Sequence, residues 1–125
     1  MNNKRKILLI EDEYFISELY HRALTRAGYE IKMISDGNEA LKEALTNQYD
    51  IILLDLMIPN LNGSDILNIL RDKSKIQDLK ARIIVTTNLE QRPEIKKQIE
   101  DKADAYLIKA ELTPGELVAF LENIK

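Results

Sequence analysis

The stretch IILLDLMIPNLNG, residues 51–63, runs from four aliphatic residues directly into the carboxylate of Asp55. A short aliphatic run without alternation is typical of a strand that is buried on both faces of a parallel sheet. Aspartate is among the residues least often buried without a partner. Asp55 is therefore either the first residue of an ordinary loop, or a carboxylate held at the end of a buried strand for chemistry.

The rest of the chain repeats this pattern of short aliphatic runs. Further runs lie at 6–10, 82–85 and 105–108, with a weaker one at 29–34. The intervening segments carry apolar residues at helical spacing, which predicts helices at 13–27, 36–45, 64–71, 92–102 and 113–124. Capping-box patterns open two of them, at Asp36 with Glu39 and at Thr113 with Glu116. Strand–helix alternation of this kind predicts an α/β fold, with a five-stranded parallel sheet and helices on both faces.

Length and composition narrow the class of protein. A chain of 125 residues fits one domain, residues 1–125, with a core of its own. It has no cysteine, which excludes disulfides and thiolate metal sites, and its net charge of −3 does not favour direct nucleic-acid binding. No signal peptide and no apolar run of about 20 residues is recognisable. We therefore expect a cytoplasmic protein without membrane contact.

The polar residues that follow the strands suggest a site. Ligands of open α/β sheets bind beyond the carboxyl ends of the strands. The first strand is followed by the acids Glu11, Asp12 and Glu13, and the third ends in Asp55. The fourth ends in Thr86, Thr87 and Asn88, and the fifth ends in Lys109. If the first and third strands are neighbours, the acids converge. Two carboxylates about 4 Å apart repel by roughly 4 kcal/mol at an effective dielectric constant of 20. Mg²⁺ relieves that repulsion, and a metal with a lysine and a hydroxyl suits a phosphoryl group.

Four motifs in this order carry a resemblance to a known family: ILLIEDE, IILLDLMIPNLNG, IIVTT and AYLIK. Together they resemble a response-regulator receiver domain of two-component signalling, of the stand-alone single-domain type. The resemblance covers essentially the whole chain. It implies the flavodoxin-like, doubly wound sheet with strand order 2-1-3-4-5 and five helices.

The resemblance also implies roles for individual residues. Asp55 matches the phosphorylated aspartate, and Gly63 matches a glycine of the loop that follows it. Four residues match the Mg²⁺ ligands, the last through its backbone carbonyl: Glu11, Asp12, Asp55 and Met57. Lys109 and Thr87 match residues that assist the transfer, and Thr87 and Tyr106 match the pair that switches on phosphorylation.

The expected function is that of a phosphoacceptor, which assists its own phosphorylation and dephosphorylation but is not an enzyme. The implied partners are a sensor histidine kinase or a histidine phosphotransfer protein, and then a downstream protein target or a second copy of the chain. The expected output surface is formed by the helix at 92–102, the strand at 105–108 and the helix at 113–124.

Three residues depart from the family pattern: Ala110 where proline usually follows the lysine, Asn88 where a small residue is usual, and Lys102 in place of a frequent glycine. None removes a catalytic atom, and they place the shape of the signalling loop in question. Because a cis bond before a non-proline residue costs about 3 kcal/mol, we predict a trans Lys109–Ala110 bond.

Other functions compete with this interpretation. A flavin-binding module of the same strand order would meet repulsion between its phosphate and the sequence EDE. A phosphatase with an aspartyl nucleophile usually carries a second acid where Met57 stands. A degenerate receiver that only binds partners would need a broken site. His21, the only histidine, is mid-helix and is expected to be solvated or half-buried rather than a phosphoacceptor.

Overall fold

The computed structural model describes residues 5–88 and 90–124 and alternates strands with helices as predicted. Its elements are β1 (Lys6–Ile10), α1 (Tyr14–Arg26), β2 (Glu30–Ile34), α2 (Gly37–Ala44), β3 (Ile51–Asp55), α3 (Gly63–Leu70), β4 (Arg82–Thr87), α4 (Pro93–Lys102), β5 (Ala105–Ile108), the 3₁₀ turn η1 (Lys109–Glu111) and α5 (Pro114–Glu122). The strands pair in parallel in the order β2-β1-β3-β4-β5. The predicted α/β fold, with its flavodoxin-like strand order, is confirmed.

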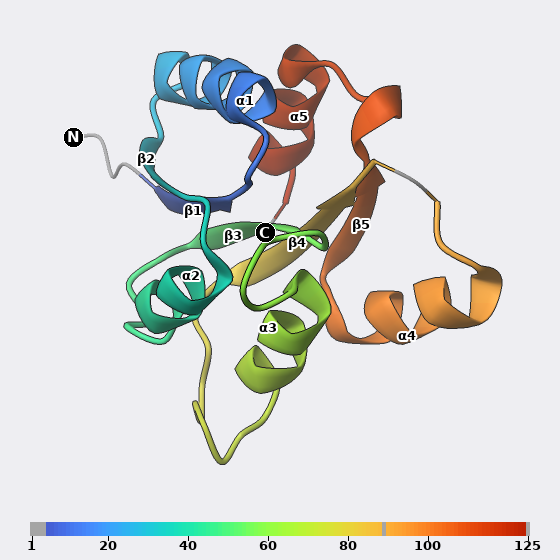
Figure 1. Ribbon diagram of the computed structural model, residues 1–125. Helices are drawn as coiled ribbons and strands as arrows, with labels where there is room; N and C mark the ends of the chain where they lie inside the picture. The colour runs from blue at the N-terminus through green and yellow to red at the C-terminus, as the bar shows by residue number, and fades with distance from the viewer. Residues whose placement is uncertain (1–4, 89, 125) are drawn as a thin grey trace.

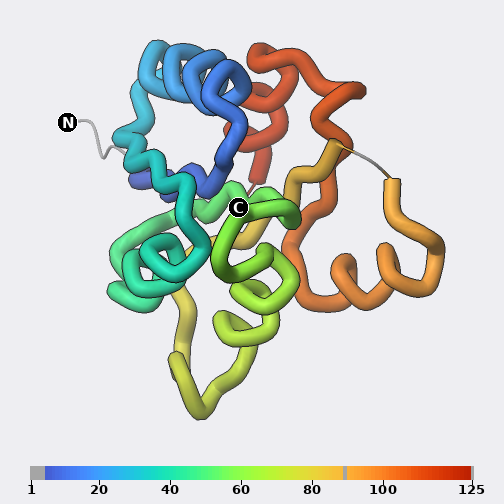
Figure 2. Tube along the Cα trace, viewed as in Figure 1, coloured from blue at the N-terminus to red at the C-terminus, as the bar shows by residue number. Residues whose placement is uncertain are grey.

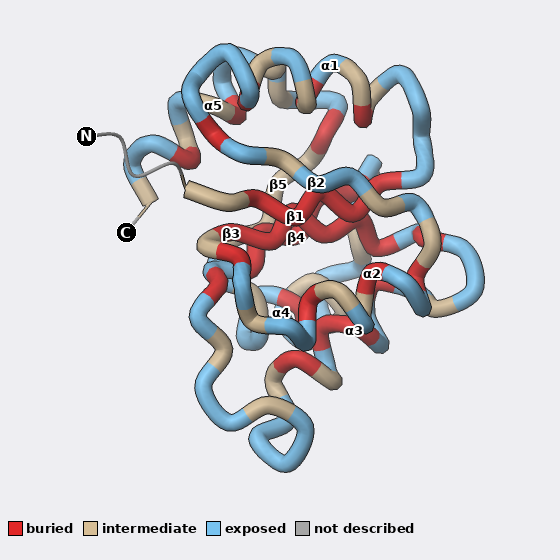
Figure 3. Tube along the Cα trace, turned by 90° about the vertical axis from the view of Figure 1, so that its left-hand side faces the viewer, coloured by how far each residue is buried: buried red, intermediate tan, exposed pale blue. Residues whose placement is uncertain are grey.

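The sheet separates two helical layers (Figure 1). Helices α1 and α5 cover one face, and α2, α3 and α4 cover the other. Because successive residues of a strand point to opposite faces, β1, β3 and β4 supply both cores. Figure 3 shows the buried residues concentrated in this central layer.

Local sequence signals explain the ends of the helices. Gly28 lies two residues beyond the last residue of α1. Its φ of +101° is a backbone conformation that favours glycine. Thr113 forms the complete capping box with Glu116. At Asp36, the structure shows the side-chain half, in which the carboxylate accepts from the Glu39 amide at 2.9 Å. Pro93 and Pro114 occupy the first turns of α4 and α5, where a missing N–H is tolerated.

Some details differ from the sequence-based expectation. The edge strands β2 and β5 are only partly buried, because each has a neighbour on one side. Asp55 is the last residue of β3, which confirms the second of the two positions that the sequence left open for it. The 71–81 connection between α3 and β4 projects away from the sheet (Figure 2).

Candidate functional site

The carboxyl edge of the sheet brings the predicted acids and the lysine together. Glu11 follows β1, Asp55 ends β3 and Lys109 follows β5. By alternation, each continues the series of residues that packs under α1 and α5. All three residues are buried, whereas Asp12 is exposed. The neighbouring positions of β1 and β3 therefore give the convergence that the sequence suggested.

Lys109 is the electrostatic centre of the site. Its ammonium Nζ lies 2.7 Å from Glu11 Oε1 and 3.0 Å from Asp55 Oδ2, and the lysine side chain is 2% exposed. A buried charge is tolerated when it is paired and hydrogen-bonded. The 3₁₀ turn η1 begins at Lys109 and carries the trans Lys109–Ala110 bond, which confirms that prediction.

Burial and neighbouring charges shift the pKa values of both Glu11 and Lys109. Burial raises the pKa of Glu11 to about 7, and the charge of Asp55 adds to this effect, although the hydrogen bond from Lys109 opposes it. Burial also disfavours the charge on Lys109. The hydrogen bond to Glu11 and the charge of Asp55 outweigh this burial, so the pKa of Lys109 lies above its ordinary value. The single lysine thus only partly compensates the acids around it.

The acids fit a hard divalent cation. Glu11, Asp12 and Asp55 each offer a carboxylate oxygen, and these oxygens lie within 4.8 Å of one another. Mg²⁺ prefers oxygen ligands and needs only one or two carboxylates, with waters completing its shell. The donor set therefore matches the predicted metal.

The loop after β3 holds Asp55 from the other side. The Met57 amide donates to Asp55 Oδ1 at 3.1 Å, and the Met57 side chain points outward, since the residue is 72% exposed. Gly63 returns the loop to β3, with its amide donating to the Leu56 carbonyl at 2.9 Å. The role of the Met57 carbonyl as a metal ligand stays a prediction. The Asp55 side chain is only 4% exposed.

Thr87 and Tyr106 lie together on the opposite face of the sheet. Thr87 ends β4 and is buried, and Tyr106 is paired in register with Val85, two residues earlier. The Tyr106 hydroxyl accepts a hydrogen bond from the Gln91 amide at 3.2 Å, and the Lys96 ammonium lies 5.4 Å from the centre of the ring. Tyr106 thus connects β5 to the segment between β4 and α4, and its predicted role as a switch stays a prediction.

Two residues without a predicted role also reach the site. Asn88 Nδ2 donates to Glu13 Oε1 at 2.8 Å, and the same oxygen lies 3.5 Å from Lys109 Nζ. The hydrogen bond from Asn88 holds the pKa of Glu13 below its usual value. The sequence placed both Glu13 and Asn88 at this edge, after β1 and β4, but nothing in it indicated that the two side chains would be bonded to each other.

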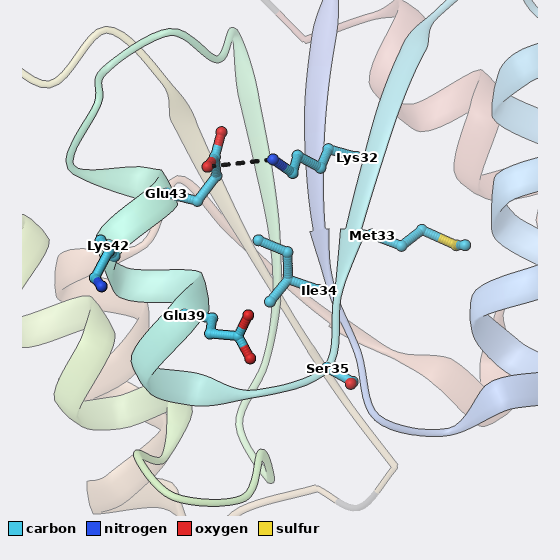
Figure 4. A pocket seen from close by; sticks show the side chains of 7 residues that line it. All are labelled: Lys32, Met33, Ile34, Ser35, Glu39, Lys42 and Glu43. Carbon is cyan, nitrogen blue, oxygen red and sulfur yellow. Dashed lines mark ion pairs between the residues drawn. The ribbon is translucent and has the colours of Figure 1, made fainter.

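A separate pocket lies on the outer edge of β2 (Figure 4). It has a volume of about 430 Å³ and is lined by residues of β2 and α2, among them Lys32 and Glu43, which form an ion pair at 3.4 Å. Lys32 and Ile34 point toward α2, whereas Met33 points to the other face. This pocket lacks the three converging acids. The candidate functional site is therefore the one at the carboxyl edge of the sheet.

The fold and the acidic edge together define an α/β domain of the flavodoxin-like class with a site beyond its strands. The model of the response regulator receiver domain matches residues 7–122. The chain belongs to this family, the receiver domains of two-component systems. The predicted membership of the receiver-domain family is confirmed, and the stand-alone, single-domain type stays a prediction.

Individual relatives agree. The alkaline phosphatase synthesis transcriptional regulatory protein PhoP of Bacillus subtilis is 36% identical over 96% of this chain and 48% of its own length. The transcriptional regulatory protein CusR of Escherichia coli K12 is 36% identical over 83% of this chain and 44% of its own. The high-resolution structure of chemotaxis response regulator CheY4 of Vibrio cholerae superposes with a TM-score of 0.80 at 30% identity, covering 96% of this chain and 98% of that one.

The chain spans about half or less of the length of the curated relatives named here. Their names describe transcriptional regulators, whereas the matched part here is the receiver domain. Within the described residues, no helix is both long and apolar enough to cross a membrane.

Proposed function

We propose that Asp55 accepts a phosphoryl group from a phosphohistidine, and that Mg²⁺ is required. The observation that carries this proposal is the arrangement of three carboxylates within 4.8 Å of one another, with the Lys109 ammonium 3.0 Å from Asp55 Oδ2. A purely structural cluster has no reason to accept such repulsion.

Each residue of the site has its own part in the phosphoryl transfer. An Asp55 carboxylate oxygen attacks phosphorus while the bond from phosphorus to the donor nitrogen breaks, which leaves an acyl phosphate on Asp55. Lys109 stabilises negative charge on the phosphoryl oxygens, and the Met57 amide orients the carboxylate. Glu11 and Asp12 would hold Mg²⁺ together with Asp55 and the Met57 carbonyl. When bound, the ion supplies charge neutralisation at the phosphoryl oxygens.

The output follows from a local change of charge. The phosphoryl group draws the Thr87 hydroxyl toward it, and Tyr106 moves into the space that Thr87 leaves. The surface formed by α4, β5 and α5 then changes its affinity for a downstream protein or for a second copy of the chain. The phosphoryl donor is a sensor histidine kinase or a histidine phosphotransfer protein, and the setting is the cytoplasm. We further propose that this domain makes no direct contact with nucleic acid, in keeping with its net charge of −3.

The alternative of a phosphorylation-independent binding module is less well supported. Such a module has no need of Lys109, which is 2% exposed and contacts both Glu11 and Asp55.

Intact-mass measurement after treatment with acetyl phosphate tests the proposal. We expect one phosphoryl adduct in the presence of Mg²⁺, and none with excess chelator or in Asp55→Asn. An adduct that forms equally well in the chelator or in the variant would refute the proposal.

A further inference from the structure

Glu13 connects two parts of the chain at the mouth of the site. It is the N-cap residue of α1, and its side chain is 47% exposed. Its Oε1 atom accepts a hydrogen bond from Asn88 Nδ2 at 2.8 Å and lies 3.5 Å from Lys109 Nζ. One carboxylate oxygen therefore joins the segment after β4 to the buried lysine.

The contact with Glu13 matters because Lys109 has a limited number of donors. An ammonium group has three N–H bonds, and three carboxylates lie around it: those of Glu11, Asp55 and Glu13. The Glu11 and Asp55 side chains are 1% and 4% exposed, and their contacts, at 2.7 and 3.0 Å, are the shorter ones. Glu13 is thus the ligand of Lys109 that an incoming phosphoryl oxygen can displace.

We propose that Glu13, held in place by Asn88, is a positioning residue that slows phosphoryl transfer by occupying Lys109 in the resting protein. This inference rests on the proposed function and names its regulation. For transfer to occur, the contact of the Glu13 carboxylate with the Lys109 ammonium must break, so that the ammonium can bind a phosphoryl oxygen. Asn88 directly follows Thr87, so a displacement of Thr87 toward the phosphoryl group pulls on the same hydrogen bond.

The bridge has little importance for stability. Ion pairs that are half exposed contribute little to folding, because solvent screens them and long side chains lose freedom. The effect of Glu13 is therefore expected in the kinetics of the site, where Lys109 must change partners.

Two substitutions of Glu13 separate its charge from its hydrogen bond. Glu13→Gln keeps an acceptor for Asn88 but removes the negative charge that lies beside the Lys109 ammonium. Glu13→Ala removes both the acceptor and the charge. Asn88→Ala releases Glu13 from its anchor. The control Glu122→Gln removes the same charge from an exposed position at the end of α5, where the helix has run back from the carboxyl edge.

The rate of adduct formation with acetyl phosphate is measured at saturating Mg²⁺ in about 0.5 M salt, where the screening length is about 4 Å and long-range charge effects are suppressed. We expect Glu13→Gln and Glu13→Ala to react about threefold faster or more, because one N–H of Lys109 is released. Asn88→Ala is expected to react about twofold faster, and to add nothing in the Glu13→Gln background, because Asn88 acts only through Glu13. Glu122→Gln is expected to react like wild type.

A second measurement needs neither metal nor phosphate. In metal-free protein, the side-chain NH₂ resonances of Asn88 should be almost unchanged by Glu13→Gln, and should move toward the solvated position in Glu13→Ala. Wild-type rates for both Glu13 variants, or independent effects of Asn88→Ala and Glu13→Gln, would overturn the inference while leaving the proposed function intact. A wild-type protein that takes up no phosphoryl group would overturn both.

Discussion

Asp55 is held from two sides, since the Met57 amide binds one carboxylate oxygen and Lys109 binds the other. This arrangement fixes the direction of the carboxylate while the strand behind it stays fully buried. The position of the loop that carries Met57 depends in turn on one close approach, between Gly63 and the end of β3.

Gly63 lies so close to the backbone at the end of β3 that we expect any side chain at this position to destabilise the fold. A Cβ atom at this position would lie 2.3 Å from the Asp55 carbonyl oxygen and 2.7 Å from Leu56 Cα, so the loop backbone would have to shift. We expect Gly63→Ala to lower the free energy of unfolding by about 1–3 kcal/mol, the range for overpacked sites, as measured by urea unfolding.

Gly115→Ala is the matched control. There the nearest atom, Thr113 Oγ1, would lie 3.9 Å from the added Cβ, which is ordinary contact. We expect this variant to be neutral or more stable by up to about 1 kcal/mol. Equal stability of Gly63→Ala and Gly115→Ala would show that the approach of the loop to β3 is not tight.

At the scale of elements, the sequence predicted what depends on local pattern. The aliphatic runs located all five strands, and capping residues such as Thr113 and Asp36 located helix starts. The 3₁₀ turn η1 escaped prediction because three residues carry no periodicity. The contact of Glu13 with Asn88 escaped as well, because it joins residues 75 positions apart and depends on how two loops meet.

Helix α4 is the element that we expect to open most easily. It has one buried residue, Ile99, whereas α3 has four: Gly63, Ile66, Leu67 and Leu70. Its last residue, Lys102, is nevertheless bonded to the C-cap residue of α3, since Arg71 Nε donates to the Lys102 carbonyl at 2.5 Å. We predict faster amide hydrogen exchange in α4 than in α3. Slower or equal exchange in α4 would contradict this account of its packing.

The output surface is tested at the same scale. Adding a beryllofluoride mimic of the phosphoryl group should change hydrogen exchange within residues 90–112, because Tyr106 and the Gln91 amide are bonded there. Changes confined to α1 and α3 would place the output elsewhere. We expect Tyr106→Ala to uncouple partner binding from phosphorylation, and a variant that keeps the coupling intact would also place the output elsewhere.

For the whole molecule, we expect repulsion among the clustered acids to lower the stability of the metal-free fold. Asp55→Asn removes a charge that repels Glu11, and Lys109 keeps its contact with Glu11. We therefore expect the variant to have a higher metal-free melting temperature than wild type. A lower or unchanged value would show that the Asp55–Lys109 pair outweighs the repulsion.

Mg²⁺ should stabilise the wild-type fold by mass action. At tenfold excess over its dissociation constant, a ligand that binds only the folded state adds about 1.4 kcal/mol. Thermal melts should show this rise in wild type and a smaller one in Asp55→Asn, which has lost a ligand. Equal rises in the two proteins would place the ion away from Asp55.

The central claim is that the carboxylate of Asp55 itself carries the phosphoryl group. Borohydride reduces an acyl phosphate of aspartate to homoserine, so treatment of the phosphorylated protein followed by peptide mass spectrometry identifies the modified residue. The account predicts homoserine at position 55 and unmodified aspartate at position 12. Phosphorylated protein that yields no homoserine at position 55, with the phosphoryl group on His21 or on another residue, would contradict it.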